Sequence, residues 1–222
     1  MKAPFFPDQR VKKPLTLAHW VNLWPLTAWG YELWRFRALS LLSGRPFPLS
    51  EELARMLQAM EPVAERDFLD LGTSTGLYAR ALLRAGATRV WALDLSPAML
   101  RVAWRKAQGH PRLVPLLARA EAIPLASASV DGVVVGGSWN EFPQPQEVIR
   151  EMHRVLRPGG RLWIMFSHRS ASPVQQLLAW SGLRFPTLET LLESLSKSGF
   201  AVRGWREGAV GFVTGTKVTS GV

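Results

Sequence analysis

The sequence predicts an α/β fold in which a mostly parallel sheet of seven strands is covered by helices on both faces. From residue 66 onward, short apolar segments alternate with helical segments, which is typical of a sheet whose strands are buried on both sides. Hydrophobic residues make up 47% of the 222 residues and charged residues 20%, which suffices for a packed core. This length fits one domain with a small additional element.

Residues 1–60 differ from the rest and are predicted to form an N-terminal helical cap on a domain that spans 61–222. Tryptophan is concentrated at the start of this segment, and helical spacing begins at Pro25, a residue suited to a first helical turn. A second helix is expected from Ser50, which is a good N-cap residue. The cap either packs on the main domain or forms a lid over a hydrophobic substrate. The substrate-contact candidates of the lid are Trp20, Trp24 and Tyr31.

The main domain is expected to alternate strands with helices. The apolar segments predict strands at Asp67–Leu71, Arg89–Asp94, Leu113–Leu117, Val130–Val135 and Arg161–Ser167. The helices between them are predicted at Gly76–Ala85, Pro97–Gln108 and Gln146–Leu156. A helix at Leu188–Ser198 then precedes strands at Phe200–Arg206 and Val210–Lys217, and the short gap between these strands predicts an antiparallel hairpin. Ligands of such sheets bind beyond the carboxyl ends of the parallel strands.

The first strand runs into a glycine-containing loop, Asp70-Leu71-Gly72-Thr73-Ser74-Thr75-Gly76. A dinucleotide fingerprint needs glycine where Ser74 and Leu77 stand, and the Gly-Lys-Ser/Thr of a phosphate-binding loop is absent. The remaining pattern is an acid followed by spaced small residues, which lets the backbone approach a cofactor closely. The string around Ser74 also matches the Gly-x-Ser-x-Gly of a nucleophile elbow, so a hydrolase is a rival hypothesis.

A second carboxylate, Asp94, ends the next predicted strand. At that place a carboxylate can accept hydrogen bonds from both hydroxyls of a ribose. Ser96 and Pro97 follow as an N-cap and a first-turn proline, and an alternative assigns Asp94 only to that cap. Together with the loop, Asp94 favours a cofactor that carries adenosine.

These residues resemble the first motif of class I S-adenosylmethionine (SAM) methyltransferases. Three later stretches also resemble this family, namely Arg119–Leu125, Ser129–Val135 and the Pro-Gly-Gly turn within Glu151–Leu162. The resemblance covers roughly residues 64–217 and is strongest to the branch of ubiquinone/menaquinone-biosynthesis methyltransferases, methyltransferase type 11. It implies a Rossmann-like seven-stranded sheet with a C-terminal antiparallel hairpin, and SAM as the cofactor.

The resemblance also implies roles for particular residues. Asp70 would attract the ammonium group of SAM, and the Ala120 amide would contact the adenine. Arg119 stands where the family has an acid that contacts adenine N6, and Ser74 stands where it has a glycine. The cofactor-binding candidates are Asp70, Gly72, Thr73, Ser74, Gly76, Asp94, Leu95, Ala120, Glu121 and Gly136.

The catalytic candidates follow the fourth and fifth strands. Where the family often has a His-His or His-Trp pair facing the acceptor, this sequence has Asn140 and Glu141. Glu141 is a candidate general base or a partner for a cationic acceptor, and the alternative is a solvated loop carboxylate. The residues considered for catalysis or acceptor contact are Glu141, Asn140, His168 and Trp139. No metal is expected, because no cluster has metal-ligand spacing.

The favoured interpretation is a SAM-dependent methyltransferase that transfers a methyl group by direct displacement to a small, lipophilic or aromatic acceptor. The net charge of +10 supports a less favoured alternative, an RNA methyltransferase acting on ribose or a ring nitrogen. No run of five basic residues supports it, and the absence of cysteine excludes the thiolate route. A third hypothesis is a non-catalytic SAM-binding protein.

The sequence also gives expectations for the cellular compartment and for the cause of the basic composition. The N-terminus has no apolar signal region, and no segment has the length and hydropathy of a membrane span, so a cytoplasmic location is expected. The diffuse, arginine-rich basic charge is interpreted as a sign of either genome composition or a heat-adapted organism. The sequence predicts no oligomeric state.

Overall fold

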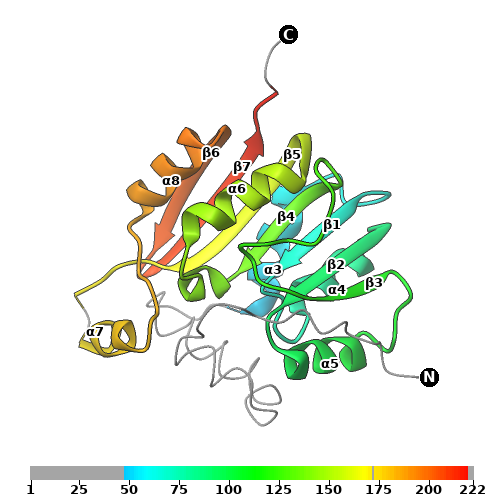
Figure 1. The fold of residues 1–222 in the computed structure, drawn as a ribbon, viewed down its shortest axis with the longest axis horizontal. Helices are drawn as coiled ribbons and strands as arrows, with labels where there is room; N and C mark the ends of the chain where they lie inside the picture. Colours follow the sequence, from blue (N-terminus) through cyan, green and yellow to red (C-terminus); the bar gives the residue numbers. More distant parts are fainter. Residues whose placement is uncertain (1–47, 172, 220–222) are drawn as a thin grey trace.

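The computed structural model describes residues 48–171 and 173–219 and contains one seven-stranded sheet with helices on both faces (Figure 1). The strands are β1 (Asp67–Leu71), β2 (Arg89–Asp94), β3 (Leu113–Leu117), β4 (Val130–Gly136), β5 (Leu156–Ser167), β6 (Phe200–Glu207) and β7 (Val210–Lys217). Their order across the sheet is β3-β2-β1-β4-β5-β7-β6. The predicted lid residues Trp20, Trp24 and Tyr31 lie outside the described residues.

The strand directions confirm the predicted fold class. The strands β1 to β5 pair in parallel, and β7 pairs antiparallel with both β5 and β6. The strand order reverses between β1 and β4, because the chain builds outward to β3 and then returns to the other side of β1. The loops after β1 and β4 diverge at that point, which is where open α/β sheets bind ligands.

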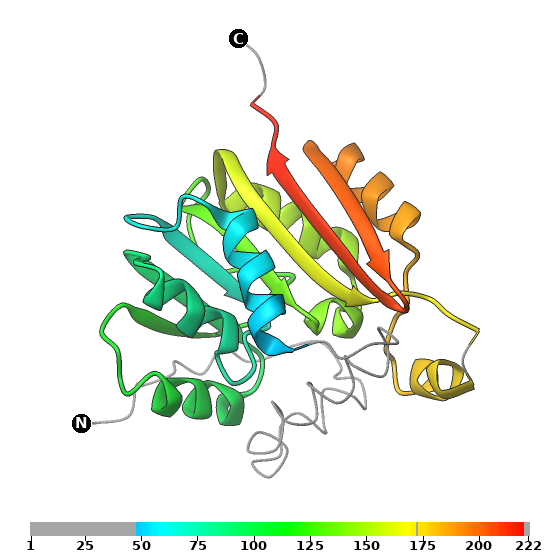
Figure 2. The same ribbon diagram turned by 180° about the vertical axis from the view of Figure 1, so that it is seen from behind.

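The helices cover the sheet with apolar side chains. They are α3 (Leu49–Met60), α4 (Leu77–Arg84), α5 (Pro97–Lys106), α6 (Pro145–Val155), α7 (Pro173–Trp180) and α8 (Leu188–Lys197), with a 3₁₀ helix η1 (Ser138–Glu141). Side chains of α3 and α4 pack into one core cluster, and side chains of α6 and α8 pack into another across the sheet. Figure 2 shows α3 lying across one face of the sheet, opposite the face that α6 and α8 cover in Figure 1.

Two sequence predictions need correction, and one helix was not predicted. The fifth strand begins at Leu156 rather than Arg161, because Leu156 already pairs with Val130 of β4. The register then shifts at the Pro-Gly-Gly segment, and pairing resumes between Arg161 and Gly132. Ser50 is not the N-cap, since α3 begins at Leu49 and Pro48 holds the cap position. The helix α7 was not predicted, because its sequence has no helical alternation of apolar and polar residues and exposes Trp180 to 89%.

Two further properties concern only the part of the chain that the structure describes. None of its helices combines the length and the hydropathy needed to cross a bilayer. Within the same residues, no group of three His, Asp or Glu side chains is arranged to hold a metal ion.

Candidate functional site

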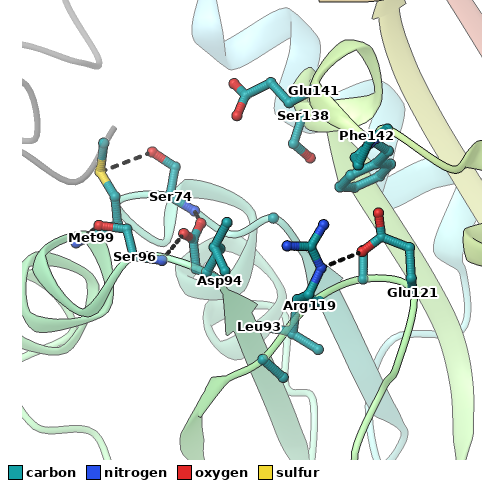
Figure 3. A pocket seen from close by; sticks show the side chains of 15 residues that line it. Ser74, Leu93, Asp94, Ser96, Met99, Arg119, Glu121, Ser138, Glu141 and Phe142 are labelled. Atoms are coloured by element: carbon teal, nitrogen blue, oxygen red, sulfur yellow. Dashed lines mark hydrogen bonds and ion pairs between the residues drawn. The ribbon is translucent and has the colours of Figure 1, made fainter. Parts of the chain in front are cut away.

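A pocket lies at the carboxyl edge of the sheet, where the loops after β1, β2, β3 and β4 meet (Figure 3). Seven predicted site residues line it, namely Gly72, Ser74, Asp94, Leu95, Ala120, Glu121 and Glu141. Lining residues that were not predicted as site residues include Ser96, Met99, Arg119, Ser138 and Phe142. Ser138 and Phe142 flank the predicted site residues 139–141 in the sequence. This proximity along the chain was the signal that could have identified them.

Asp94 is fixed in the pocket by the backbone of two loops. Its Oδ2 accepts a hydrogen bond from the Ser74 amide at 2.8 Å, and its Oδ1 accepts one from the Ser96 amide at 2.8 Å. Burial raises the pKa of Asp94 to about 6, although the amide hydrogen bonds of Ser96, Ser74 and Leu95 oppose this shift. The carboxylate therefore links the loops after β1 and β2 and retains lone pairs for a ligand.

Asp70 is buried and braces the glycine loop from outside the pocket lining. Its Oδ2 accepts hydrogen bonds from the Thr73 hydroxyl at 2.6 Å and from the Ala79 amide at 2.9 Å. Gly76 precedes α4 with a left-handed φ of 77°, a conformation that glycine adopts without strain. The structure thus places Asp70, Thr73 and Gly76 at the junction of β1 and α4, and none of the three lines the pocket.

Replacing Asp70 with alanine is expected to lower the free energy of unfolding by about 2–4 kcal/mol, because the Ala79 amide and the Thr73 hydroxyl both lose a buried acceptor. Urea unfolding followed by circular dichroism measures this loss. Glu193→Ala, which removes only an exposed ion pair with Lys197, should change stability by less than about 1 kcal/mol. An equally small change in the Asp70 variant would contradict the bracing role.

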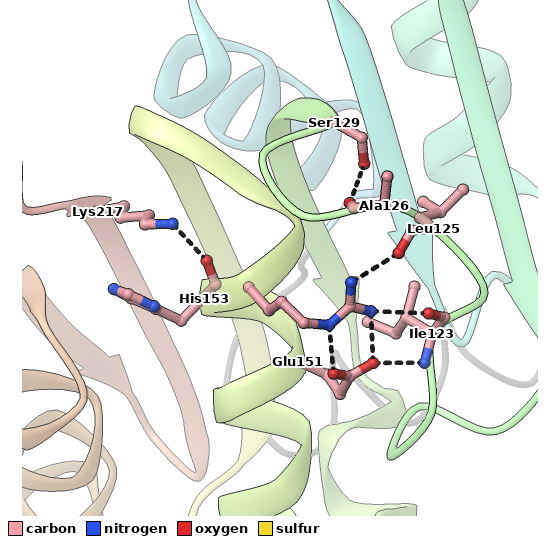
Figure 4. A network of polar contacts seen from close by, with 8 residues as sticks. Ile123, Leu125, Ala126, Ser129, Glu151, His153 and Lys217 are labelled. Carbon is pink, nitrogen blue, oxygen red and sulfur yellow. Dashed lines mark hydrogen bonds and ion pairs between the residues drawn. The ribbon is translucent and has the colours of Figure 1, made fainter.

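The loop after β3 carries Arg119 to Glu121 and is held against α6 by a polar network (Figure 4). The Glu151 carboxylate accepts a hydrogen bond from the Ile123 amide at 2.7 Å. The Arg154 guanidinium donates to Glu151 at 2.6 Å and to the carbonyls of Ile123 and Leu125 at 2.8 and 2.7 Å. The hydrogen bonds from Arg154 lower the pKa of Glu151, so this carboxylate stays ionised.

Two predicted glycines make room for side chains of neighbouring elements. At Gly72, where φ is 69°, an added Cβ would lie 2.3 Å from Ser138 Oγ, which itself donates to the Leu71 carbonyl. At Gly136 an added Cβ would lie 2.8 Å from the Tyr78 ring. Gly72 lines the pocket, whereas Gly136 does not.

The residues after β4 divide between the pocket and the interior. Glu141 ends η1 and lines the pocket, whereas Trp139 is buried edge-on against Phe142 with 5.8 Å between ring centroids. Asn140 is buried, and its Nδ2 donates to the carbonyls of Ser167 and Arg184 at 2.8 and 2.6 Å. Asn140 therefore ties η1 to the segment after β5 and lies outside the pocket lining, as Trp139 does.

His168 follows β5 and is also outside the pocket lining. Its Nδ1 lies 2.7 Å from the Arg169 carbonyl and 3.4 Å from Arg206 Nη1. Its Nε2 is buried without a hydrogen-bond partner. The structure therefore separates His168 from Glu141, the candidate base in the pocket.

The comparisons with known proteins agree with this geometry. A family model described as a methyltransferase domain matches residues 69–164. An uncharacterised methyltransferase of Mycobacterium bovis is 42% identical over 126 residues, which are 57% of this chain and 48% of the relative. A ubiquinone/menaquinone biosynthesis C-methyltransferase of Acidiphilium cryptum is 34% identical over 134 residues, covering 58% and 54% of the two chains. The chain thus spans about half the length of the curated relatives it matches.

The solved structures include a phosphoethanolamine N-methyltransferase of Haemonchus contortus in complex with phosphomonomethylethanolamine and S-adenosylhomocysteine. It superposes with a TM-score of 0.67 at 17% identity, covering 76% of this chain and 53% of that one. The hydrolase alternative has no support in the site, because the Ser74 hydroxyl lies against Met99 Sδ at 3.5 Å. These matches support a class I SAM-dependent methyltransferase similar to the branch of the ubiquinone/menaquinone C-methyltransferases.

Proposed function

We propose that the protein binds SAM in the pocket at the carboxyl edge of the sheet and transfers its methyl group to a small acceptor. The observation that carries the proposal is Asp94, whose carboxylate is held by the amides of Ser74 and Ser96 at the carboxyl end of β2. A fixed carboxylate at that position can accept both hydroxyls of a ribose. The family match and the SAM-derived ligand of the solved relative support the same cofactor.

The other lining residues fit an adenosine group. Met99 and Phe142 supply apolar surface, and Arg119 and Glu121 supply buried polar atoms. SAM, when bound, supplies a methyl group already activated by the sulfonium. The protein then has to hold the cofactor and the acceptor in line and exclude water, since proximity and orientation provide most of the acceleration.

Glu141 is the side chain proposed to act on the acceptor. It lines the same pocket and can accept a proton from a phenol or an acidic carbon, or pair with a cationic acceptor. A lipophilic or aromatic acceptor is the proposed class, because curated relatives are named as quinone-biosynthesis and 2-phytyl-1,4-naphtoquinone methyltransferases. Asn140 and His168 are proposed to support this region through the segment after β5.

The test combines binding and turnover. Titration calorimetry should show micromolar binding of S-adenosylhomocysteine (SAH), and labelled SAM should methylate members of a panel of phenolic and quinol acceptors. Glu141→Gln should lower kcat by about 10²–10⁴-fold while leaving SAH affinity within about threefold. A failure of the wild-type protein to bind SAH would contradict the proposal.

The other outcomes of the same assay identify the alternatives. Methyl transfer to RNA, with binding that weakens steeply as salt rises, would indicate the RNA methyltransferase suggested by the net charge of +10. SAH binding without turnover on any acceptor would indicate a non-catalytic SAM-binding protein.

A further inference from the structure

Arg119 and Glu121 form an ion pair on the wall of the pocket (Figure 3). Arg119 Nε lies 3.3 Å from Glu121 Oε2, and the two side chains are only 12% and 8% exposed. The pair does not satisfy all of its polar atoms. Arg119 Nη1 and Glu121 Oε1 are both buried without a hydrogen-bond partner.

Such atoms are costly to bury, so their presence in a pocket points to a ligand that satisfies them. Glu121 Oε1 can only accept a hydrogen bond while the carboxylate is ionised, and Arg119 Nη1 can only donate one. The pair therefore offers a ligand one acceptor beside one donor. The edge of adenine that carries the amino group has the complementary arrangement, with N6–H as donor beside a ring nitrogen as acceptor.

We propose that Glu121 recognises the adenine amino group of the cofactor and that Arg119 both positions Glu121 and donates to an adjacent ring nitrogen. This inference rests on the proposed function, because it assumes that SAM occupies the pocket. It gives a physical role to the arginine at position 119. Glu121 is the acceptor, and the arginine holds it in place.

The loop that carries the pair is anchored by contacts within the protein itself. Glu151 holds the Ile123 amide, and Arg154 holds the carbonyls of Ile123 and Leu125, so the segment after Glu121 is anchored to α6. Because these hydrogen bonds restrain the loop, the pair should select its ligand by hydrogen-bond pattern rather than adapt to it.

S-inosylhomocysteine is the probe that tests this pattern, because it differs from SAH only at the base. Its hypoxanthine has a carbonyl oxygen in place of the amino group and an N–H in place of the N1 acceptor, which reverses the pattern. The intact protein should bind SAH at least about 100-fold more tightly than S-inosylhomocysteine, since the mismatch leaves buried groups unpaired. Calorimetric titration of both ligands gives the affinity ratio.

Glu121→Gln should reduce this ratio to below about tenfold, because an amide can donate to the hypoxanthine oxygen as well as accept from the adenine amino group. Glu147→Gln makes the same chemical change at an exposed residue of α6 and should leave the ratio unchanged. Arg119→Gln should weaken SAH binding and lower the affinity ratio of SAH to S-inosylhomocysteine only in part. It serves as the second variant if a thermal melt shows that Glu121→Gln does not fold.

The outcomes separate the inference from the function on which it rests. Wild-type protein that does not bind SAH would overturn the proposed function. Wild-type protein that binds SAH and S-inosylhomocysteine equally well, or a Glu121→Gln variant that keeps the full ratio, would overturn the role of Glu121 while leaving SAM binding in place.

Discussion

SAH affinity is expected to fall by about tenfold for each pH unit below about 6, because the carboxyl group of Asp94 takes up a proton there. The ionised carboxylate accepts from the Ser74 and Ser96 amides and can still accept from the ribose. Protonation removes acceptor capacity at the position where the ribose hydroxyls are proposed to bind. Calorimetric titrations with SAH between pH 5 and 8 measure this dependence.

The stability of the ligand-free protein should respond to the same group with the opposite sign. Burial raises the folded-state pKa of Asp94 from 3.8 to about 6, so the folded protein binds the proton more tightly than the unfolded chain does. The resulting stabilisation is complete below pH 3.8 and is lost as the pH rises through 6. Because Asp94 is partly exposed, we expect a contribution of about 1–2 kcal/mol rather than the ~3 kcal/mol of a fully desolvated group.

Asp94→Asn provides the control, because its amide does not titrate. This variant should bind SAH about 100-fold more weakly at pH 8, and its remaining affinity should not change between pH 5 and 7. A flat pH profile in the wild-type protein, or a pH step that persists in Asp94→Asn, would show that another group controls binding.

The strands and most helices of this fold could be predicted because their signals are local. Strand β4 contains the continuous buried apolar run Val133–Val135, and Pro97 and Gly199 mark the beginning of one helix and the end of another. The start of β5 could not be predicted, because it depends on the pairing of Leu156 with Val130 across the sheet. The helix α7 was missed because its apolar side chains Leu177 and Trp180 face solvent.

The pocket could be predicted in outline but not in its connections. The positions of Gly72, Ser74 and Asp94 after successive strands predicted that they lie at one edge of the sheet, because parallel strands end at the same edge. The spacing did not show that the Asp70 carboxylate accepts a hydrogen bond from the Ala79 amide. It also did not show that the Asn140 amide donates to the carbonyls of Ser167 and Arg184. Such contacts join loops that are distant in sequence, so no local pattern encodes them.

A second large effect is expected from Tyr78→Phe, which should lower the free energy of unfolding by about 2–4 kcal/mol. The Tyr78 hydroxyl donates to the Glu52 carboxylate at 2.6 Å and accepts from the Trp163 indole N–H at 3.2 Å. All three side chains are at most 2% exposed. Removing one oxygen thus deprives two buried polar groups of a partner, and water has little access to replace it.

The double variant Glu52→Leu/Tyr78→Phe distinguishes a polar network from simple packing. If the hydroxyl matters because it satisfies the Glu52 carboxylate, removing both groups should cost less than the sum of the single variants, with a coupling of about 1–3 kcal/mol. Strictly additive losses in urea unfolding would show that the Tyr78 hydroxyl and the Glu52 carboxylate contribute independently. A measured coupling would mean that Glu52, in the first turn of α3, is joined through Tyr78 to β5 and to the carboxyl end of β4. Because the proposed SAM pocket opens at that edge, the first turn of α3 would then be anchored near it by a buried carboxylate.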